Sequence, residues 1–128
     1  MALKGKNKKK CKSLTESFKF AFEGLFFALR NVRNFKIHLF FTFLVIAGGF
    51  YFRISAFEWL ICLVFIALVI SLELINTAIE ETVNLAMPNI HPVAKIAKDV
   101  AASGVLISAI ISVIVGFIIF LPKIIDMF

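Results

Sequence analysis

Carboxylate and carboxamide side chains recur at helical spacing near the end of the second apolar stretch of this chain. Glu73, Asn76 and Glu80 fall within about 60° of one another on a helix that turns roughly 100° per residue. Thr77 and Asn84 continue the same stripe. Burying an unpaired carboxylate at membrane depth is strongly unfavourable unless another group compensates it. The stripe therefore predicts a functional site with a cationic partner.

A second polar group comes at the start of the last apolar stretch. His91 and Pro92 interrupt the chain, and Lys98 and Asp99 directly precede the apolar run. Because one helix enters the interface and the next leaves it, we expect this pair to lie near the depth of Glu80. The two groups together supply a general base, oxygen ligands for a metal and a cation for phosphate. These are the parts of a phosphoryl-transfer site.

The same side chains also have a purely structural interpretation. Carboxylates and lysines near the end of a membrane helix often extend to the interface or pair across helices. We prefer this interpretation for Glu81, which projects roughly 80° around the helix from Glu73. For His91 we prefer a loop role, with Pro92 setting the start of a helix. The sequence has no GxxxxGK[ST] loop, no kinase glycine-rich loop and no His/Cys metal spacing, so ATP chemistry would need another scaffold.

The composition places these residues in a membrane protein. The chain is 61% hydrophobic with 16 Phe and only 17% charged residues, which lies far outside the average for soluble domains. Three apolar runs carry the hydrophobicity, and the last contains the roughly 20 residues that a bilayer crossing requires. The first two approach this length with their flanking residues. The sequence thus predicts an all-α integral membrane fold with three spans.

The N-terminal part is expected to lie on the membrane surface. We interpret residues 1–12 as a flexible basic segment that binds anionic headgroups, and nucleic-acid binding is not expected. A single domain at 13–128 follows, and Ser13 with Glu16 has the spacing of a capping box. Its expected elements are an amphipathic surface helix at 13–31 and membrane spans at 35–52, 57–86 and 93–121.

Charge predicts the orientation of the spans. Ten of the fourteen Lys and Arg residues precede Ile37, so the positive-inside rule places the N-terminus in the cytoplasm. Counting crossings then puts the segment with Lys95 and Lys98 inside as well. The polar stripe accordingly opens towards the cytoplasm, where ATP is found.

The two polar groups resemble the signature of the small bacterial integral-membrane lipid kinases. The matching segments are ELINTAIE at 73–80 and HPVAKIAKDVAA at 91–102, and the likeness extends from about Ser13 to Lys123. That family contains prokaryotic diacylglycerol kinase and undecaprenol kinase. The resemblance implies a homotrimer in the bacterial cell membrane, with active sites shared between subunits. It also implies ATP with Mg²⁺ as the phosphate donor and a membrane lipid alcohol as the acceptor.

The resemblance also implies roles for individual residues. Glu73 matches the general base of the family, with Asn76 beside it in the site. Glu80 matches a metal-binding carboxylate. Lys98 and Asp99 match the pair that orients the phosphates.

Val32 departs from the family pattern. At this position the family carries a glutamate that shares the metal with the residue matching Glu80, and a valine cannot ligate a metal. Three explanations stay open: a natural loss of activity, a deliberate or accidental substitution, or a ligand set in which Glu80 acts with phosphate oxygens and water. Since Mg²⁺ usually keeps several waters, we expect strongly reduced turnover at ordinary Mg²⁺ rather than none.

The catalytic residues do not distinguish undecaprenol from diacylglycerol, because both present a primary alcohol at the interface. Peripheral segments resemble the undecaprenol kinase branch: Glu58-Trp59, Arg33-Asn34-Phe35, His91-Pro92 and residues 120–123. Undecaprenol is thus the favoured acceptor, and diacylglycerol kinase is the alternative.

Two other classes of protein stay open at this point. Small multidrug transporters also depend on an intramembrane glutamate, although they have four spans and carry it deep within the first. A non-catalytic membrane protein with interfacial charges is the other alternative.

Overall fold

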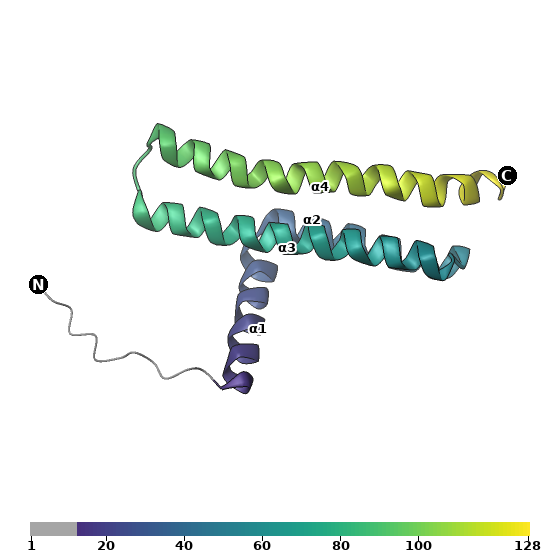
Figure 1. The fold of residues 1–128 in the computed structure, drawn as a ribbon, viewed down its shortest axis with the longest axis horizontal. Helices are drawn as coiled ribbons and strands as arrows, with labels where there is room; N and C mark the ends of the chain where they lie inside the picture. Colours follow the sequence, from purple (N-terminus) through teal and green to yellow (C-terminus); the bar gives the residue numbers. More distant parts are fainter. Residues whose placement is uncertain (1–12) are drawn as a thin grey trace, which may run out of the picture.

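The computed structural model describes residues 13–128, so the expected basic segment at 1–12 lies outside the described residues. The described part consists of four helices and contains no strand: α1 (Leu14–Asn31), α2 (Arg33–Phe52), α3 (Ala56–Ala86) and α4 (Pro92–Ile125). Helices α2, α3 and α4 run alongside one another, and α1 lies across their direction (Figure 1). The predicted all-helical fold class is thereby confirmed.

Helices α2, α3 and α4 are each long and apolar enough to cross a membrane. The shortest of them has 20 residues, and about 1.5 Å of rise per residue gives the roughly 30 Å of a hydrocarbon core. Most of their large apolar side chains are exposed on the outside of the single chain. Helices that are apolar on their outer faces belong in a membrane.

The helix ends differ in places from the expected boundaries. The sequence predicts that the last span ends at 121, whereas α4 continues through Pro122 to Ile125. A proline in the last turn removes only one intrahelical hydrogen bond, so the helix tolerates it there. Helix α2 begins at Arg33 rather than at 35, because Val32 alone separates it from α1.

Side-chain caps fix the starts of the helices. Ser13 Oγ accepts a hydrogen bond from Glu16 N at 3.3 Å, which is the half of the expected capping box that holds the first turn of α1. A complete capping box that the sequence analysis did not identify starts α3, where Ser55 and Glu58 exchange bonds of 3.2 and 2.9 Å. Arg53 ends α2 in the left-handed conformation, with φ of 50°.

The end of the bundle at the α2–α3 loop is held by close packing. Trp59 lies against Gly49, where an added Cβ would come within 2.6 Å of the indole ring. Glu58 Oε1 accepts a hydrogen bond from Lys123 Nζ at 2.8 Å, which ties α3 to α4. Glu58 and Trp59, at the start of α3, therefore pack this helix against α2 and α4.

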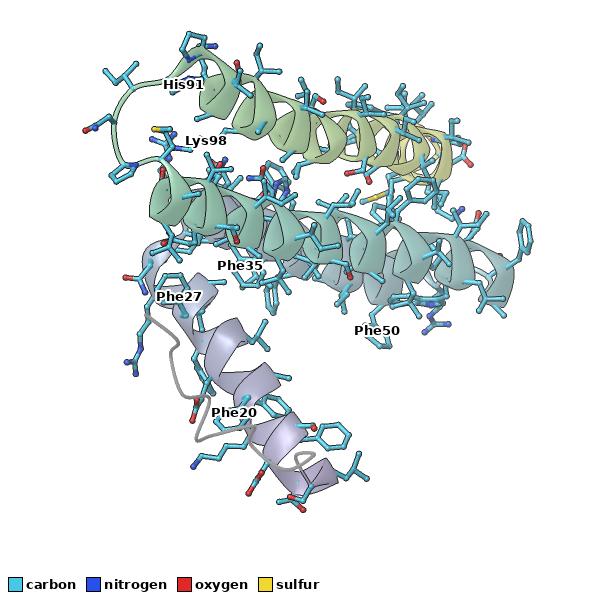
Figure 2. The ribbon with its side chains drawn as sticks, turned by 60° about the vertical axis from the view of Figure 1, so that its left-hand side comes forward. Phe20, Phe27, Phe35, Phe50, His91 and Lys98 are labelled. Atoms are coloured by element: carbon cyan, nitrogen blue, oxygen red, sulfur yellow. The ribbon has the colours of Figure 1, made fainter. Side chains whose placement is uncertain are left out.

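Helix α1 makes few contacts with the rest of the chain. Ala28 is its one buried residue, and Phe35 is buried just after the junction with α2. The predicted apolar face of α1, including Phe18 and Phe22, is exposed in the single chain. Figure 2 shows Phe20 on the part of this helix away from the main bundle, and Phe27 near the end that meets the bundle. A helix lying across the spans with an uncovered apolar face suits a membrane surface.

Candidate active site

The polar stripe of α3 is buried at Glu73 and Asn76, whereas Glu80 is half-buried and Asn84 is exposed. Glu73 and Asn76 are 2% and 6% exposed, and Glu73 is one of the two largest fully buried side chains. Asn76 Nδ2 donates to Glu80 Oε1 at 3.1 Å, and Thr77 Oγ1 donates to the backbone oxygen of Glu73 at 2.9 Å. Asn76 and Glu80 are thus hydrogen-bonded to each other, and Glu73 lies with them in the walls of the same cavities.

The partner of Glu73 is a histidine of α2. His38 Nε2 lies 3.7 Å from Glu73 Oε2, and this is the one ion-pair contact of Glu73 within residues 13–128. The sequence predicts a cationic partner for the polar stripe. In the structure the side chain beside Glu73 is the imidazole of His38. Because a histidine carries a charge only when protonated, the pair can hold or release a proton.

Two cavities reach this group of side chains from different sides. One has a volume of about 260 Å³, lies towards α1, and is here called the Val32 cavity. The other has a volume of about 440 Å³, lies towards α4, and is called the Asp99 cavity. Four residues line both cavities: Asn34, Glu73, Asn76 and Glu80. The carboxylates are therefore reachable from both sides of α3.

Val32 and Glu80 line the same cavity. Val32 is the single residue between α1 and α2, and its backbone N–H donates to Ala28 O at 2.9 Å. The junction between α1 and α2 therefore determines that the side chain of residue 32 lines the Val32 cavity. Glu81 lines this cavity as well, although its helical angle favoured a purely structural role.

Lys98 and Asp99 occupy different surroundings. Asp99 lines the Asp99 cavity with Glu73 and Glu80, and it also pairs with Lys95. Lys98 instead donates to Asn84 Oδ1 and lines a separate cavity of about 260 Å³ at the α3–α4 loop. Successive residues on a helix point about 100° apart, so the two side chains diverge. Figure 2 shows Lys98 beside this loop.

His91 caps α4. Its Nδ1 accepts a hydrogen bond from Val93 N at 3.1 Å, and Pro92 follows at the first helical position. The side chain also lines the loop cavity with Lys98.

The oxygen donors of the site fit a magnesium nucleotide in part. Asn76 Oδ1 is buried and has no hydrogen-bond partner among the described residues, and the Glu80 carboxylate is bonded to the same side chain. Carboxylate and carboxamide oxygens are ligands that suit Mg²⁺. Residues 13–128 contain no group of three or more His, Cys, Asp or Glu side chains placed to hold a metal. A metal at Glu80 would therefore depend on phosphate oxygens and water for most of its ligands.

Sequence reasoning missed two residues of the site, Asn34 and His38. They are four residues apart on α2, so they share a face of that helix. Both line the Asp99 cavity with Glu73. The available signal was a pair of polar residues at helical spacing where the first apolar run begins.

Three apolar helices around a buried carboxylate group define an integral-membrane protein with an internal polar site. The family model described as Prokaryotic diacylglycerol kinase matches residues 19–120. The chain is 45% identical over 108 residues to the undecaprenol kinase of Bacillus subtilis. The matched segment covers 84% of this chain and 88% of that protein. The chain is 39% identical over 116 residues to the diacylglycerol kinase of a Synechocystis species, covering 90% of this chain and 66% of that protein.

The chain belongs to the prokaryotic diacylglycerol kinase family, and it is a membrane lipid kinase. The resemblance noted in the sequence is thereby confirmed. The family assignment decides against the transporter and the non-catalytic membrane protein that the sequence left open.

Proposed function

We propose that this protein transfers the γ-phosphoryl group of ATP to the hydroxyl of undecaprenol, at the cytoplasmic face of a bacterial cell membrane. Similarity to an undecaprenol kinase along most of both chains supports the choice of acceptor. The observation that carries the chemistry is the buried carboxylate of Glu73, which two cavities approach from different sides. One side is available to a nucleotide and the other to a lipid alcohol.

Glu73 is the proposed general base. A lipid hydroxyl loses its proton only as the new P–O bond forms, so a carboxylate close to the oxygen is sufficient. The O–H bond of the alcohol breaks and Glu73 takes the proton, while the alcohol oxygen bonds to the γ-phosphorus of ATP. The bond between that phosphorus and the β–γ bridging oxygen breaks, and ADP leaves with this oxygen. Burial favours this role because it excludes the water that would compete with the alcohol.

Glu80 and Asn76 are the proposed holders of Mg²⁺. Asn76 Oδ1 has no hydrogen-bond partner among the described residues, and Asn76 and Glu80 both line each of the two cavities. The metal, when bound, would offset charge on the phosphates. Val32 offers no ligand, so we expect the reaction to need more Mg²⁺ than it would with a carboxylate at this position.

We also propose that the active site is shared between subunits of a homotrimer. Within one chain Lys98 lines a different cavity from Glu73, although the proposed chemistry needs a cation near the phosphates. A neighbouring subunit could supply its own Lys98 to the carboxylates of this chain. The many exposed apolar side chains of α2, α3 and α4 leave room for such contacts.

Diacylglycerol is the second candidate acceptor, favoured by the similarity to a diacylglycerol kinase. A coupled assay of ADP release in mixed micelles compares undecaprenol, diacylglycerol and no added lipid. We expect release to depend on lipid and to be faster with undecaprenol. Faster ADP release with diacylglycerol would make diacylglycerol the acceptor in place of undecaprenol. ADP release that is the same with either lipid as without lipid, at every Mg²⁺ concentration, would contradict the proposed reaction.

A further inference from the structure

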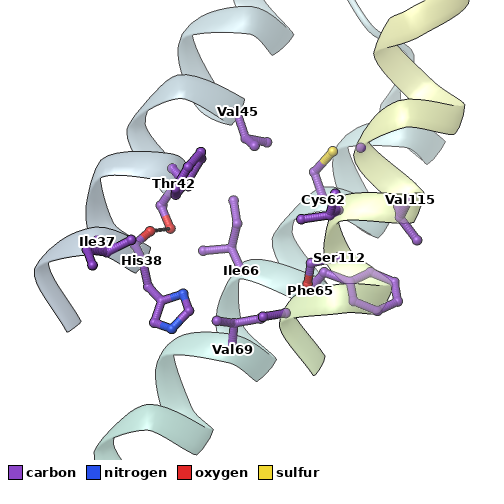
Figure 3. A pocket seen from close by; sticks show the side chains of 14 residues that line it. Ile37, His38, Thr42, Val45, Cys62, Phe65, Ile66, Val69, Ser112 and Val115 are labelled. Atoms are coloured by element: carbon purple, nitrogen blue, oxygen red, sulfur yellow. Dashed lines mark hydrogen bonds between the residues drawn. The ribbon is translucent and has the colours of Figure 1, made fainter. Parts of the chain in front are cut away.

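His38 stands at the boundary between a polar and an apolar cavity. It lines the Asp99 cavity with Glu73, and it also lines an apolar cavity of about 220 Å³ between α2, α3 and α4. In Figure 3 the imidazole lies at the end of the apolar cavity near Val69, while Val45 lies at the other end. Its side chain is 19% exposed, so apolar walls restrict its motion on one side.

The side chains of His38 and Glu73 lie close to each other without forming a hydrogen bond. The distance of 3.7 Å between Nε2 and Oε2 is within ion-pair range but longer than a hydrogen bond. Contacts of this kind around a catalytic group are often long without substrate and shorten when the substrate is bound.

We propose that His38 is a positioning residue for the lipid-kinase reaction, orienting the Glu73 carboxylate through Nε2. This inference rests on the proposed role of Glu73 as the general base. With Oε2 directed to the imidazole, the other carboxylate oxygen is the one presented to the acceptor hydroxyl. The ring contacts Glu73, and it lines the Asp99 cavity but not the Val32 cavity.

The replacements at His38 separate orientation from packing. In His38→Gln the side-chain amide reaches the position of Nε2 and still donates, whereas the shorter amide of His38→Asn stops before it. His38→Leu fills the space without any donor. Thr42→Val is the matched control, since Thr42 lies one turn further along α2 and its hydroxyl bonds only to the backbone oxygen of His38 in the structure.

The experiment measures kcat, the KM for ATP and the KM for the lipid, in detergent-purified protein whose melting temperature is also recorded. We expect kcat to fall about 10- to 100-fold in His38→Leu and His38→Asn, as misplacement of a catalytic group by about an ångström does. His38→Gln should stay within about threefold of the parent, and the KM for ATP should change less than about twofold in every variant. Thr42→Val should behave as the parent.

Three results would overturn the inference. They are a His38→Leu variant with parental kcat, a His38→Gln variant as impaired as His38→Asn, or a change in the lipid KM with kcat unaltered. If His38→Leu does not fold, the comparison of Gln with Asn decides alone. A parent protein that is inactive with both lipids, also after Val32→Glu, would instead contradict the proposed function.

Discussion

Val32, between α1 and α2, and Glu80 of α3 line one cavity although they lie far apart in the sequence. The single-residue junction between α1 and α2 places the valine in that wall, and the C-terminal half of α3 supplies the carboxylate. A substitution at position 32 therefore changes the surroundings of Glu80 directly. The resemblance to the family places a metal-binding glutamate at this position.

Val32→Glu should raise the rate of phosphoryl transfer and lower the Mg²⁺ concentration that gives half-maximal activity. A second carboxylate in the cavity completes the metal site, and we expect a gain of about 10- to 100-fold, the size that metal-site residues typically contribute. Activity is titrated against Mg²⁺ at saturating lipid. Val32→Gln, which adds bulk and polarity without charge, should gain much less. Equal rates and equal metal dependence in Val32→Glu and the parent would make position 32 irrelevant.

Glu73→Gln should abolish transfer while nucleotide binding is kept. The amide fills the same space but cannot take a proton, and a general base contributes about 10²- to 10⁴-fold to a rate. Transfer is measured by lipid phosphorylation and binding by equilibrium dialysis of ATP. Glu23→Gln on the exposed side of α1 is the control and should act as the parent. Parental turnover in Glu73→Gln would remove this residue from the role of base.

Mixed trimers should reveal whether sites are shared. Glu73→Gln and Lys98→Gln are each expected to be inactive as homotrimers. When the two are co-expressed at equal amounts, about a quarter of the interfaces in a symmetric ring pair an intact Glu73 with the intact Lys98 of a neighbour. Activity should then return to about that fraction of the parent. Mixed protein as inactive as each variant alone would place both residues in the site of one subunit.

Gly49→Ala should destabilise the end of the bundle at the α2–α3 loop. An added Cβ would lie 2.6 and 2.7 Å from carbons of the Trp59 ring, and a rigid indole cannot yield without moving α3. Overpacking of this kind costs about 1–3 kcal/mol. Thermal unfolding in detergent measures it, with Gly24→Ala as the control because its added Cβ meets nothing within 4 Å. A melting temperature unchanged from the parent would contradict the close approach.

The sequence alone predicts the elements well because each depends on local pattern. The apolar runs predict the three long helices. The spacing of Glu73, Asn76 and Glu80 places them on one face of α3, independently of how the other helices pack against it. Helix α4 extends past the predicted span end at 121, through Pro122 to Ile125.

The tertiary part of the site is harder to predict. His38 meets Glu73 only because α2 packs on α3 at that register, and no local pattern specifies that packing. Lys98 and Asp99 are adjacent in the sequence, yet one bonds to Asn84 at the loop and the other lines the carboxylate cavity. The rotation of α4 decides which of the two faces the site, and periodicity in an almost wholly apolar helix does not define it.

The most direct test of the account is transfer of radioactive phosphate from the γ-position of ATP to lipid in mixed micelles. Undecaprenol and diacylglycerol are compared for the parent protein, Val32→Glu and Val32→Glu combined with Glu73→Gln. We expect labelled undecaprenyl phosphate from the parent, more from Val32→Glu, and none from the double variant. No labelled lipid from Val32→Glu with either alcohol, or undiminished labelling in the double variant, would contradict it.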